Sequence, residues 1–159
     1  MTNPFCPRPP HQTTWQLNTY GTTILKGTSP VGGSVYGAGL YGYGLYGYGV
    51  STPGNVTGMI QIGPLVPHTW WTVSSVVIAT ASVNNLSTFY LYRNAISTGA
   101  LVGTSLNGNA DTVAPATSPL TAGESLIGVW IGGDNAAQAS MVLLGTISQT
   151  AVASGVASQ

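Results

Sequence analysis

The chain has 159 residues, enough for one domain with a substantial core and too few for two ordinary domains. It carries only three cationic and three anionic side chains, so its formal net charge is zero, while 43% of its residues are hydrophobic. Three scattered cations cannot form the basic patch that neutralises several phosphates, and this excludes nucleic-acid binding.

The first ten residues predict an extended segment and no export signal. A basic stretch followed by an apolar one, which secretion requires, is missing there. Four prolines favour extended backbone instead. The single cysteine, Cys6, excludes an internal disulfide, although a bridge to another chain stays open. No window of the sequence approaches the roughly 20 apolar residues that would cross a bilayer, so we expect no membrane insertion.

Residues 35–50 form a pentad repeat, with Leu-Tyr-Gly-Tyr-Gly occurring twice in succession. Because five is odd, successive pentads turn their tyrosines to opposite faces of an extended backbone, and neither face can form a conventional core. Such a run either is a flexible linker or packs against another chain. We expect the second, with an assembly interface made by Phe5, Trp15, Leu17, Tyr36, Tyr41, Tyr43, Tyr46 and Tyr48.

The rest of the sequence predicts an all-β fold. Val, Ile, Thr, Trp and Tyr occur in blocks of strand length, separated by Gly, Asn, Asp and Pro, which is typical of an antiparallel β-sandwich, here jelly-roll-like. We expect a long, mostly irregular N-terminal arm over residues 1–57, the sandwich over 58–151 and a tail over 152–159. Within the arm, short extended pieces are predicted at residues 13–19, 22–26 and 56–62, the last reaching into the sandwich. The main strands are predicted at residues 70–82, 87–92, 101–106, 125–131 and 140–147.

Several of these strands are apolar on both faces. Phe89 and Leu91 alternate with Tyr90 and Tyr92, for example. Two-sided apolar strands predict that the outer sheet faces are also covered, by neighbouring subunits.

The inventory of chemical groups predicts that the chain is not an enzyme. His11 or His68 could form a nucleophilic triad with Asp111 or Asp134, but no Gly-x-Ser-x-Gly turn is present. Asp111, Glu124 and Asp134 all fall in predicted turns or at a strand entrance, which argues against a pair of glycosidase carboxylates. We therefore expect no catalytic residue and no cofactor.

One loop partly matches a calcium site. Residues 107–111 place oxygen-bearing side chains at alternate positions, but the later bidentate Glu is missing, so a tight turn is the preferred interpretation and no metal is expected. Arg93 is expected to mark the exit of its strand to solvent, with an ion pair to Asp111 or Asp134 as the alternative. A carbohydrate could stack on Trp70, Trp71, Trp130, Tyr90 or Tyr92, although burial in the core is expected for Trp71 and Trp130. The residues expected to face a ligand are Asn107, Asn109, Asp111, Asp134 and Asn135.

The motifs at residues 71–76, 89–94, 101–112, 122–134 and 144–147 resemble small β-sandwich virion proteins, of the minor tail or head-decoration type, from long-tailed actinobacterial bacteriophages. The resemblance covers about half of the chain and does not include the pentads. It implies a structural role in the virion after synthesis in the host cytoplasm, with the sandwich displayed on the particle and an arm joining it to other virion proteins and to copies of itself. A trimer or a higher symmetric oligomer is implied.

The sequence therefore predicts a tail or tail-tip component. The alternatives are a capsid decoration or head-fibre protein and a carbohydrate-binding module that attaches to host cell-wall glycan. If residues 1–57 are only an arm, their removal should leave a folded sandwich.

Overall fold

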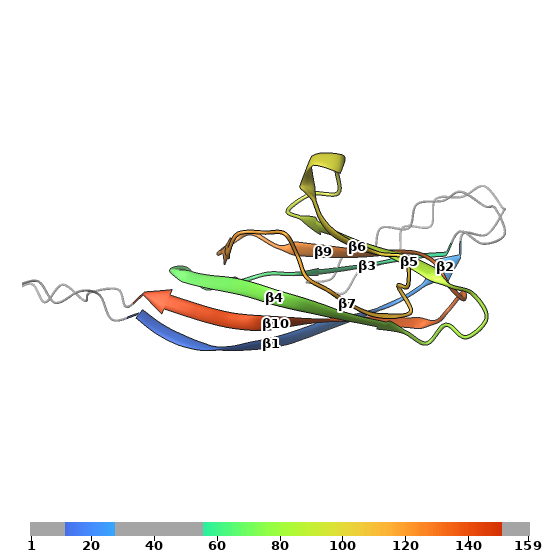
Figure 1. The fold of residues 1–159 in the computed structure, drawn as a ribbon, viewed down its shortest axis with the longest axis horizontal. Helices are drawn as coiled ribbons and strands as arrows, with labels where there is room; N and C mark the ends of the chain where they lie inside the picture. Colours follow the sequence, from blue (N-terminus) through green and yellow to red (C-terminus); the bar gives the residue numbers. More distant parts are fainter. Residues whose placement is uncertain (1–11, 28–55, 151–159) are drawn as a thin grey trace, which may run out of the picture.

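A computed structural model describes residues 12–27 and 56–150, which form two antiparallel sheets (Figure 1). The first, sheet A, has the strand order β1-β10-β4-β7. The short strand β8 also pairs with β4, nearer the start of β4 than β7 does. Its strands are β1 (Gln12–Ile24), β4 (Thr69–Thr80), β7 (Ala110–Val113), β8 (Leu120–Thr121) and β10 (Gln138–Thr150).

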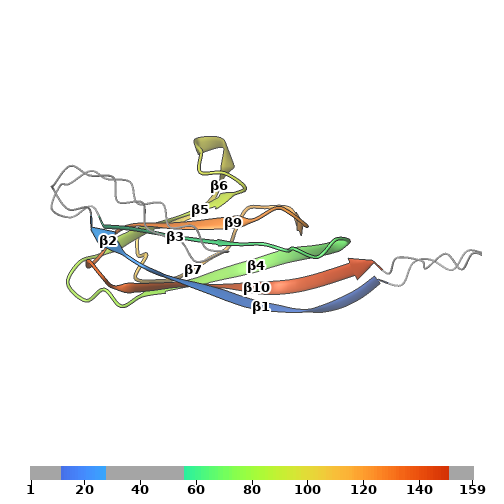
Figure 2. The same ribbon diagram turned by 180° about the vertical axis from the view of Figure 1, so that it is seen from behind.

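The second sheet, sheet B, has the order β2-β3-β9-β5-β6. Its strands are β2 (Lys26–Gly27), β3 (Val56–Ile62), β5 (Ser87–Arg93), β6 (Leu101–Ser105) and β9 (Leu126–Gly132). One 3-10 turn, η1 (Thr98–Ala100), precedes β6. The two sheets lie over one another along the length of the molecule (Figures 1 and 2). The all-β, antiparallel prediction is therefore confirmed.

Side-chain alternation explains why these segments form strands. In β3 the even-numbered residues, Val56 to Ile62, are buried and the odd-numbered ones are half-buried or exposed, as the predicted strand over 56–62 requires. The five main predicted strands are confirmed as β4, β5, β6, β9 and β10. Within the described ranges, no helix is long and apolar enough to cross a membrane.

Two strands were not predicted. Residues 110–113, which overlap the tight turn expected at 107–111, form β7, which pairs with Val76 to Ala79 of β4. The short β8 pairs with Trp70 and Trp71. Both strands are too short and too polar to show a period of two in the sequence.

A single hydrophobic core lies between the sheets and draws on both of them. Trp130 of β9 is fully buried, and its ring centroid lies 4.8 Å from that of Phe89 on β5, at a tilt of 58°. The indole nitrogen of Trp130 donates a hydrogen bond to the Gly108 carbonyl at 3.0 Å, so the buried polar atom is satisfied. Gly128 lets the layers approach, because a Cβ there would come within 2.7 Å of the Met141 sulfur.

The prediction of an arm over residues 1–57 is wrong for residues 12–27 and 56–57. All of β1 is paired with β10, from Gln12↔Thr150 to Ile24↔Gln138, without a shift of register. Leu17 and Leu25 are 1% and 0% exposed and belong to the core. Without β1, the apolar strand β10 would be an open edge, which explains why the chain recruits it.

This placement also corrects the predicted assembly interface. Leu17 belongs to the core of its own chain and not to an arm interface, whereas Trp15 remains 47% exposed. The other predicted interface residues, Phe5, Tyr36, Tyr41, Tyr43, Tyr46 and Tyr48, lie outside the described residues, as does the predicted tail over 152–159. Removal of residues 1–57 would delete β1 and β2, so we no longer expect that truncation to leave a folded domain.

The ends of the described segments meet in pairs at opposite ends of the molecule. Gln12 pairs with Thr150 at one end, and Gly27 pairs with Val56 at the other. Figure 2 shows these two ends on the right and on the left. Residues 28–55 therefore begin and end at neighbouring positions on the edge of sheet B.

We expect Leu17→Ala to lower the free energy of unfolding by about 2–5 kcal/mol, because it leaves a cavity in the core. Urea denaturation of the full chain measures this change. The matched control is Gln16→Ala, one residue earlier and exposed, which should change stability by less than about 0.5 kcal/mol. Equal effects of the two substitutions would mean that β1 is not part of the folded body.

Candidate functional site

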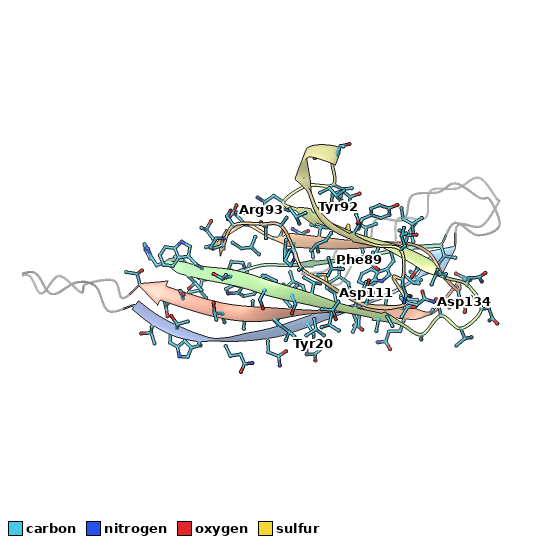
Figure 3. The ribbon with its side chains drawn as sticks, in the orientation of Figure 1. Tyr20, Phe89, Tyr92, Arg93, Asp111 and Asp134 are labelled. Atoms are coloured by element: carbon cyan, nitrogen blue, oxygen red, sulfur yellow. The ribbon has the colours of Figure 1, made fainter. Side chains whose placement is uncertain are left out.

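Three of the five residues predicted to face a ligand come together at the end of the molecule that holds Gly27 (Figure 3). Asn109 belongs to the β6–β7 connection, and Asp134 and Asn135 belong to the β9–β10 connection. Asn109 and Asp134 bind the segment 82–87, which joins β4 to β5. We name these residues and that segment the polar loop end.

Asp134 organises the β4–β5 connection. Its carboxylate accepts hydrogen bonds from the backbone N–H groups of Val83 and Asn84 at 2.7 and 2.9 Å, and from the Asn85 amide at 2.6 Å. The backbone N–H of Asn84, followed by that of Val83, holds the pKa of Asp134 below its ordinary value. The carboxylate is thus ionised and occupied by its own chain.

The asparagines of the polar loop end are also bonded internally. The Asn109 side-chain oxygen accepts hydrogen bonds from the backbone N–H and the hydroxyl of Ser87, at 3.0 and 2.6 Å. The Asn135 oxygen accepts the backbone N–H of Gly27 at 2.8 Å, which ties the last residue of β2 to the β9–β10 connection. These bonds fix the loops, and they occupy groups that were predicted to meet a ligand.

Asn107 and Asp111 do not bind segment 82–87 and have other partners. Asn107 donates to the Ala110 carbonyl at 3.0 Å and closes its own turn. Asp111, on β7, accepts hydrogen bonds from the Ser105 hydroxyl and from the backbone N–H of Thr112. The Ser105 hydroxyl is the main reason that the pKa of Asp111 is lowered. Asp111 therefore links sheet A to β6 of sheet B.

This geometry does not form a calcium loop. Asn109 faces Ser87 and Asp111 faces Ser105, so their oxygens do not converge on one centre. Among the described residues, no group of three His, Cys, Asp or Glu side chains could hold a metal ion.

Arg93 makes an ion pair at the opposite end of sheet B, with a partner that the sequence did not suggest. The proposed partners were Asp111 and Asp134, but Arg93 Nη2 lies 2.7 Å from Glu124 Oε1. Arg93 Nη1 also donates to the hydroxyls of Thr117 and Ser118 at 2.8 and 2.6 Å. One guanidinium thus binds β5 to the loop that leads into β9.

Glu124 has the most strongly shifted carboxyl group. Its Oε2 accepts the backbone N–H of Thr121 at 2.7 Å, and this bond, followed by the one from Arg93, lowers the pKa of Glu124 from 4.5 to about 2. The arrangement stabilises the turn before β9. A general acid would need the opposite shift.

The described residues do not assemble the triad that was considered. His68 is exposed, has a positive φ of 58°, and has no carboxylate within ion-pair distance among the described residues. His11 lies outside them.

The aromatic residues divide between the core and the sheet faces. Trp130 is buried, as expected, and Trp71 is partly buried against the core. Tyr90 and Tyr92 stack on each other on the side of sheet B that faces away from the core, with ring centroids 6.5 Å apart and planes at 25°. Figure 3 shows Tyr92 pointing away from the core and Phe89 pointing between the sheets.

The two tyrosines are part of an apolar surface that we name the outer face of sheet B. Strand register places Met59, Val129 and Tyr90 in one row, and Ile127 and Tyr92 in the next. Ile131 extends this surface and is 44% exposed. Its apolar part consists of Met59, Tyr90, Tyr92, Ile127, Val129 and Ile131, of which Ile127 is only 6% exposed. Thr57, Gln61, Thr88 and, at the edge, Lys26 lie on the same side of the sheet.

The corresponding side of sheet A is uncharged and mixed, with polar side chains along β1 and an apolar row of Tyr20, Val142 and Val77. Along β1 it presents Thr14, Gln16, Asn18, Tyr20 and Thr22, and Tyr20 is 71% exposed. An open hollow of about 350 Å³ on this side is lined by Thr22, Ala79, Thr80, Ala81, Gln138 and Ser140, without a charged or aromatic group.

No protein-family model matches this chain, and neither a curated protein nor a solved structure matches it.

We expect Asp134→Asn to loosen the β4–β5 connection, because an amide provides only one acceptor oxygen and no charge. The amides of Val83 and Asn84 should then exchange with solvent faster, as measured by hydrogen–deuterium exchange. Asp111→Asn removes the same charge from β7, away from the β9–β10 connection, and should leave the exchange rates of those two amides unchanged. Unaltered exchange in Asp134→Asn would show that this carboxylate does not hold the loop.

We expect Glu124→Gln to lower the free energy of unfolding at pH 7 by about 1 kcal/mol, a value reduced for partial exposure. The folded-state pKa is depressed, so the carboxylate contributes stability above pH 4.5 and loses it as the pH falls toward 2. Urea denaturation between pH 2 and 7 should show the wild type and the variant converging at the acid end. A constant difference across this range would contradict the assignment.

Proposed function

We propose that this chain is a structural component of a bacteriophage particle, a jelly-roll-like β-sandwich that serves in the tail or tail tip. Other virion proteins and copies of the chain itself are its partners. The resemblance of the strand and turn motifs to phage virion proteins suggests that the chain belongs to a phage particle. The charge distribution of the described surface supports an assembly role.

The outer face of sheet B is the single observation that carries the proposal. Charged residues make up about a quarter of a typical globular domain, yet the centre of this face has none and is built from aliphatic and aromatic side chains, with Lys26, Thr57, Gln61 and Thr88 around them. Contiguous apolar surface of this kind marks a place where another protein binds. A subunit surrounded by neighbours needs little charge to remain dispersed, because most of its surface is covered.

Four of the five charged residues in the described ranges make contacts within the molecule, and the fifth, Lys26, is exposed. Arg93 and Glu124 pair with each other, Asp134 binds backbone N–H groups, and Asp111 binds Ser105. Their roles are to hold loops in place. This use of charge fits a rigid building block better than an enzyme, whose site would require groups with accessible lone pairs or protons.

We keep the proposal that Phe5 and the pentad tyrosines attach the chain to its neighbours, but we no longer place them all in a free N-terminal arm. Phe5 and the pentad tyrosines lie outside the described residues, so their contact role remains a prediction from the sequence. Gly27 and Val56, the described residues on either side of the pentad segment in the sequence, pair with each other at the edge of sheet B. The pentads would therefore contact a neighbour as a segment between β2 and β3 and not as a free N-terminal arm.

Two alternatives remain as proposals. A capsid decoration or head-fibre protein would use the same surfaces and differ only in its position on the particle. A carbohydrate-binding module is favoured by the stacked pair Tyr90 and Tyr92 but opposed by the polar loop end, where Asn109, Asp134 and Asn135 are occupied by internal bonds. Glycan-array measurements on the full chain separate this class from the structural one.

The proposal is tested by supplying variants of the full chain during phage growth and quantifying the chain in purified particles by mass spectrometry. Val129→Lys places a charge in the centre of the outer face of sheet B and should reduce incorporation at least tenfold, since like or unpaired charge in an apolar interface costs more than about 1.4 kcal/mol. Thr72→Lys places the same charge on the opposite outer side, on β4, and should be incorporated normally.

Tyr90→Ser provides a second variant that adds no charge, and circular dichroism verifies that each variant is folded. Absence of the wild-type chain from purified particles would overturn the particle role. Normal incorporation of folded Val129→Lys and Tyr90→Ser would show that the outer face of sheet B is not the contact.

A further inference from the structure

The two sheets have four edges, and one of them differs from the rest. Sheet B ends in β2, of two residues, and in β6, of five residues, whose pairing contains a register shift. Sheet A ends on one side in β7 and β8, of four and two residues. On its other side it ends in β1, which is 13 residues long. Short or irregular edge strands protect a sheet from pairing with other chains, and β1 lacks this protection.

The composition of β1 also leaves its edge open. Residues 12–24 include no charged residue and no proline, and the pairing with β10 contains no bulge. These are the other devices by which natural proteins block an edge. From Gly21 onward, β1 packs against β3, with Ile60 directly over Gly21. This packing is across the core, and among the described residues no strand pairs with the outer edge of β1; the stretch 12–20 lies before the point where β1 passes over β3.

We propose that this edge pairs with the same edge of a second copy, antiparallel and about a two-fold axis at Gln16, so that the two copies of sheet A become one continuous sheet. In this register Gln16 meets Gln16, Thr14 meets Asn18, and Thr13 meets Thr19, which gives cross-strand pairs with hydrogen-bonding side chains on both faces. The backbone N–H and C=O groups along the edge gain partners at the same time.

The exposed indole of Trp15 favours this register. Trp15 lies on the core-facing side of β1, in a row with Ile147 and Trp71, and yet it is 47% exposed. Across the proposed axis, Trp15 would lie opposite Leu17 of the second copy. Pairing would therefore cover a large aromatic side chain that the single chain leaves half in water.

The absence of charge along this edge favours a second copy of the chain as its partner. A two-fold contact places Gln16 beside its own equivalent and the segment 12–20 beside the same segment of the second copy, so like charges in this segment would repel one another, and residues 12–20 contain none. The net charge of the whole chain is zero, so long-range repulsion does not oppose the approach of two copies.

The experiment compares Gln16→Lys and Gln16→Glu with the wild-type full chain by sedimentation equilibrium. Each variant alone places two like charges at the axis and should self-associate at least tenfold more weakly than the wild type, since like-charge juxtaposition costs more than a tenfold change in affinity. An equal mixture of the two variants should regain association, because lysine then faces glutamate.

Thr146→Lys is the matched control. Thr146 is the register partner of Gln16 on β10, is exposed, and lies on the same outer side but one strand away from the edge. This variant should associate like the wild type, and hydrogen–deuterium exchange of the β1 amides should show protection that is lost only in the two Gln16 variants.

A monomeric wild type, association that both Gln16 variants retain, or equal loss in Thr146→Lys would each overturn the pairing. The second of these outcomes would assign self-association to another surface, such as the segments outside the described residues. The pairing does not depend on the particle role, because it is measured on the purified chain. Failure to dimerise and failure to enter particles are therefore separate results.

Discussion

The antiparallel pairing of β1 with β10 is the constraint on which the rest of the structure depends. It joins the first and last described strands over 13 register partners. It brings Leu17 over the core, and it converts β10 from an edge into an interior strand of sheet A. At Leu25 the chain leaves this ladder, exchanges backbone hydrogen bonds with Ala136 and Ala137, and enters sheet B as β2. The segment 12–27 thus connects the two sheets, and it positions the polar loop end.

Much of the fold could be predicted from the sequence, and the failures have a common physical origin. Strands such as β5 and β9 were predictable because dense alternation of aromatic and β-branched residues is a local signal. Residues 12–24 were assigned to an arm because they lie between proline-rich and glycine-rich segments and show little sustained periodicity, and because their partner β10 lies at the far end of the chain. Pairing between distant segments leaves no local mark. The stabilisation of β1 comes from β10, and the composition of β1 alone does not reveal it.

The candidate site was likewise predictable in its residues but not in their partners. Asn109, Asp134 and Asn135 were recognised as polar loop residues, and the structure brings them to one end, but their partners are backbone groups of segment 82–87 and of Gly27. Which backbone N–H a carboxylate meets depends on how three loops fold together, and no spacing in the sequence encodes it. The pair of Arg93 and Glu124 was missed for the same reason. Four of the five charged residues described here hold loops of their own chain, and only Lys26, at the edge of sheet B, leaves a charge on an outer sheet face.

The positions of the chain ends have a mechanical consequence. Gln12 and Thr150 are register partners at one end, and Gly27 and Val56 are register partners at the other. A force that separates Gln12 from Thr150 would peel the ladder open one bond at a time, because the load falls on the terminal pair. A force between Thr150 and Gly27 would pull β10 and β1 in opposite directions along their length and would load all the rungs in shear at once, since the bonds of an antiparallel ladder are perpendicular to the strands. The domain therefore resists tension along its long axis much better than splitting at the end where its terminal strands begin and finish.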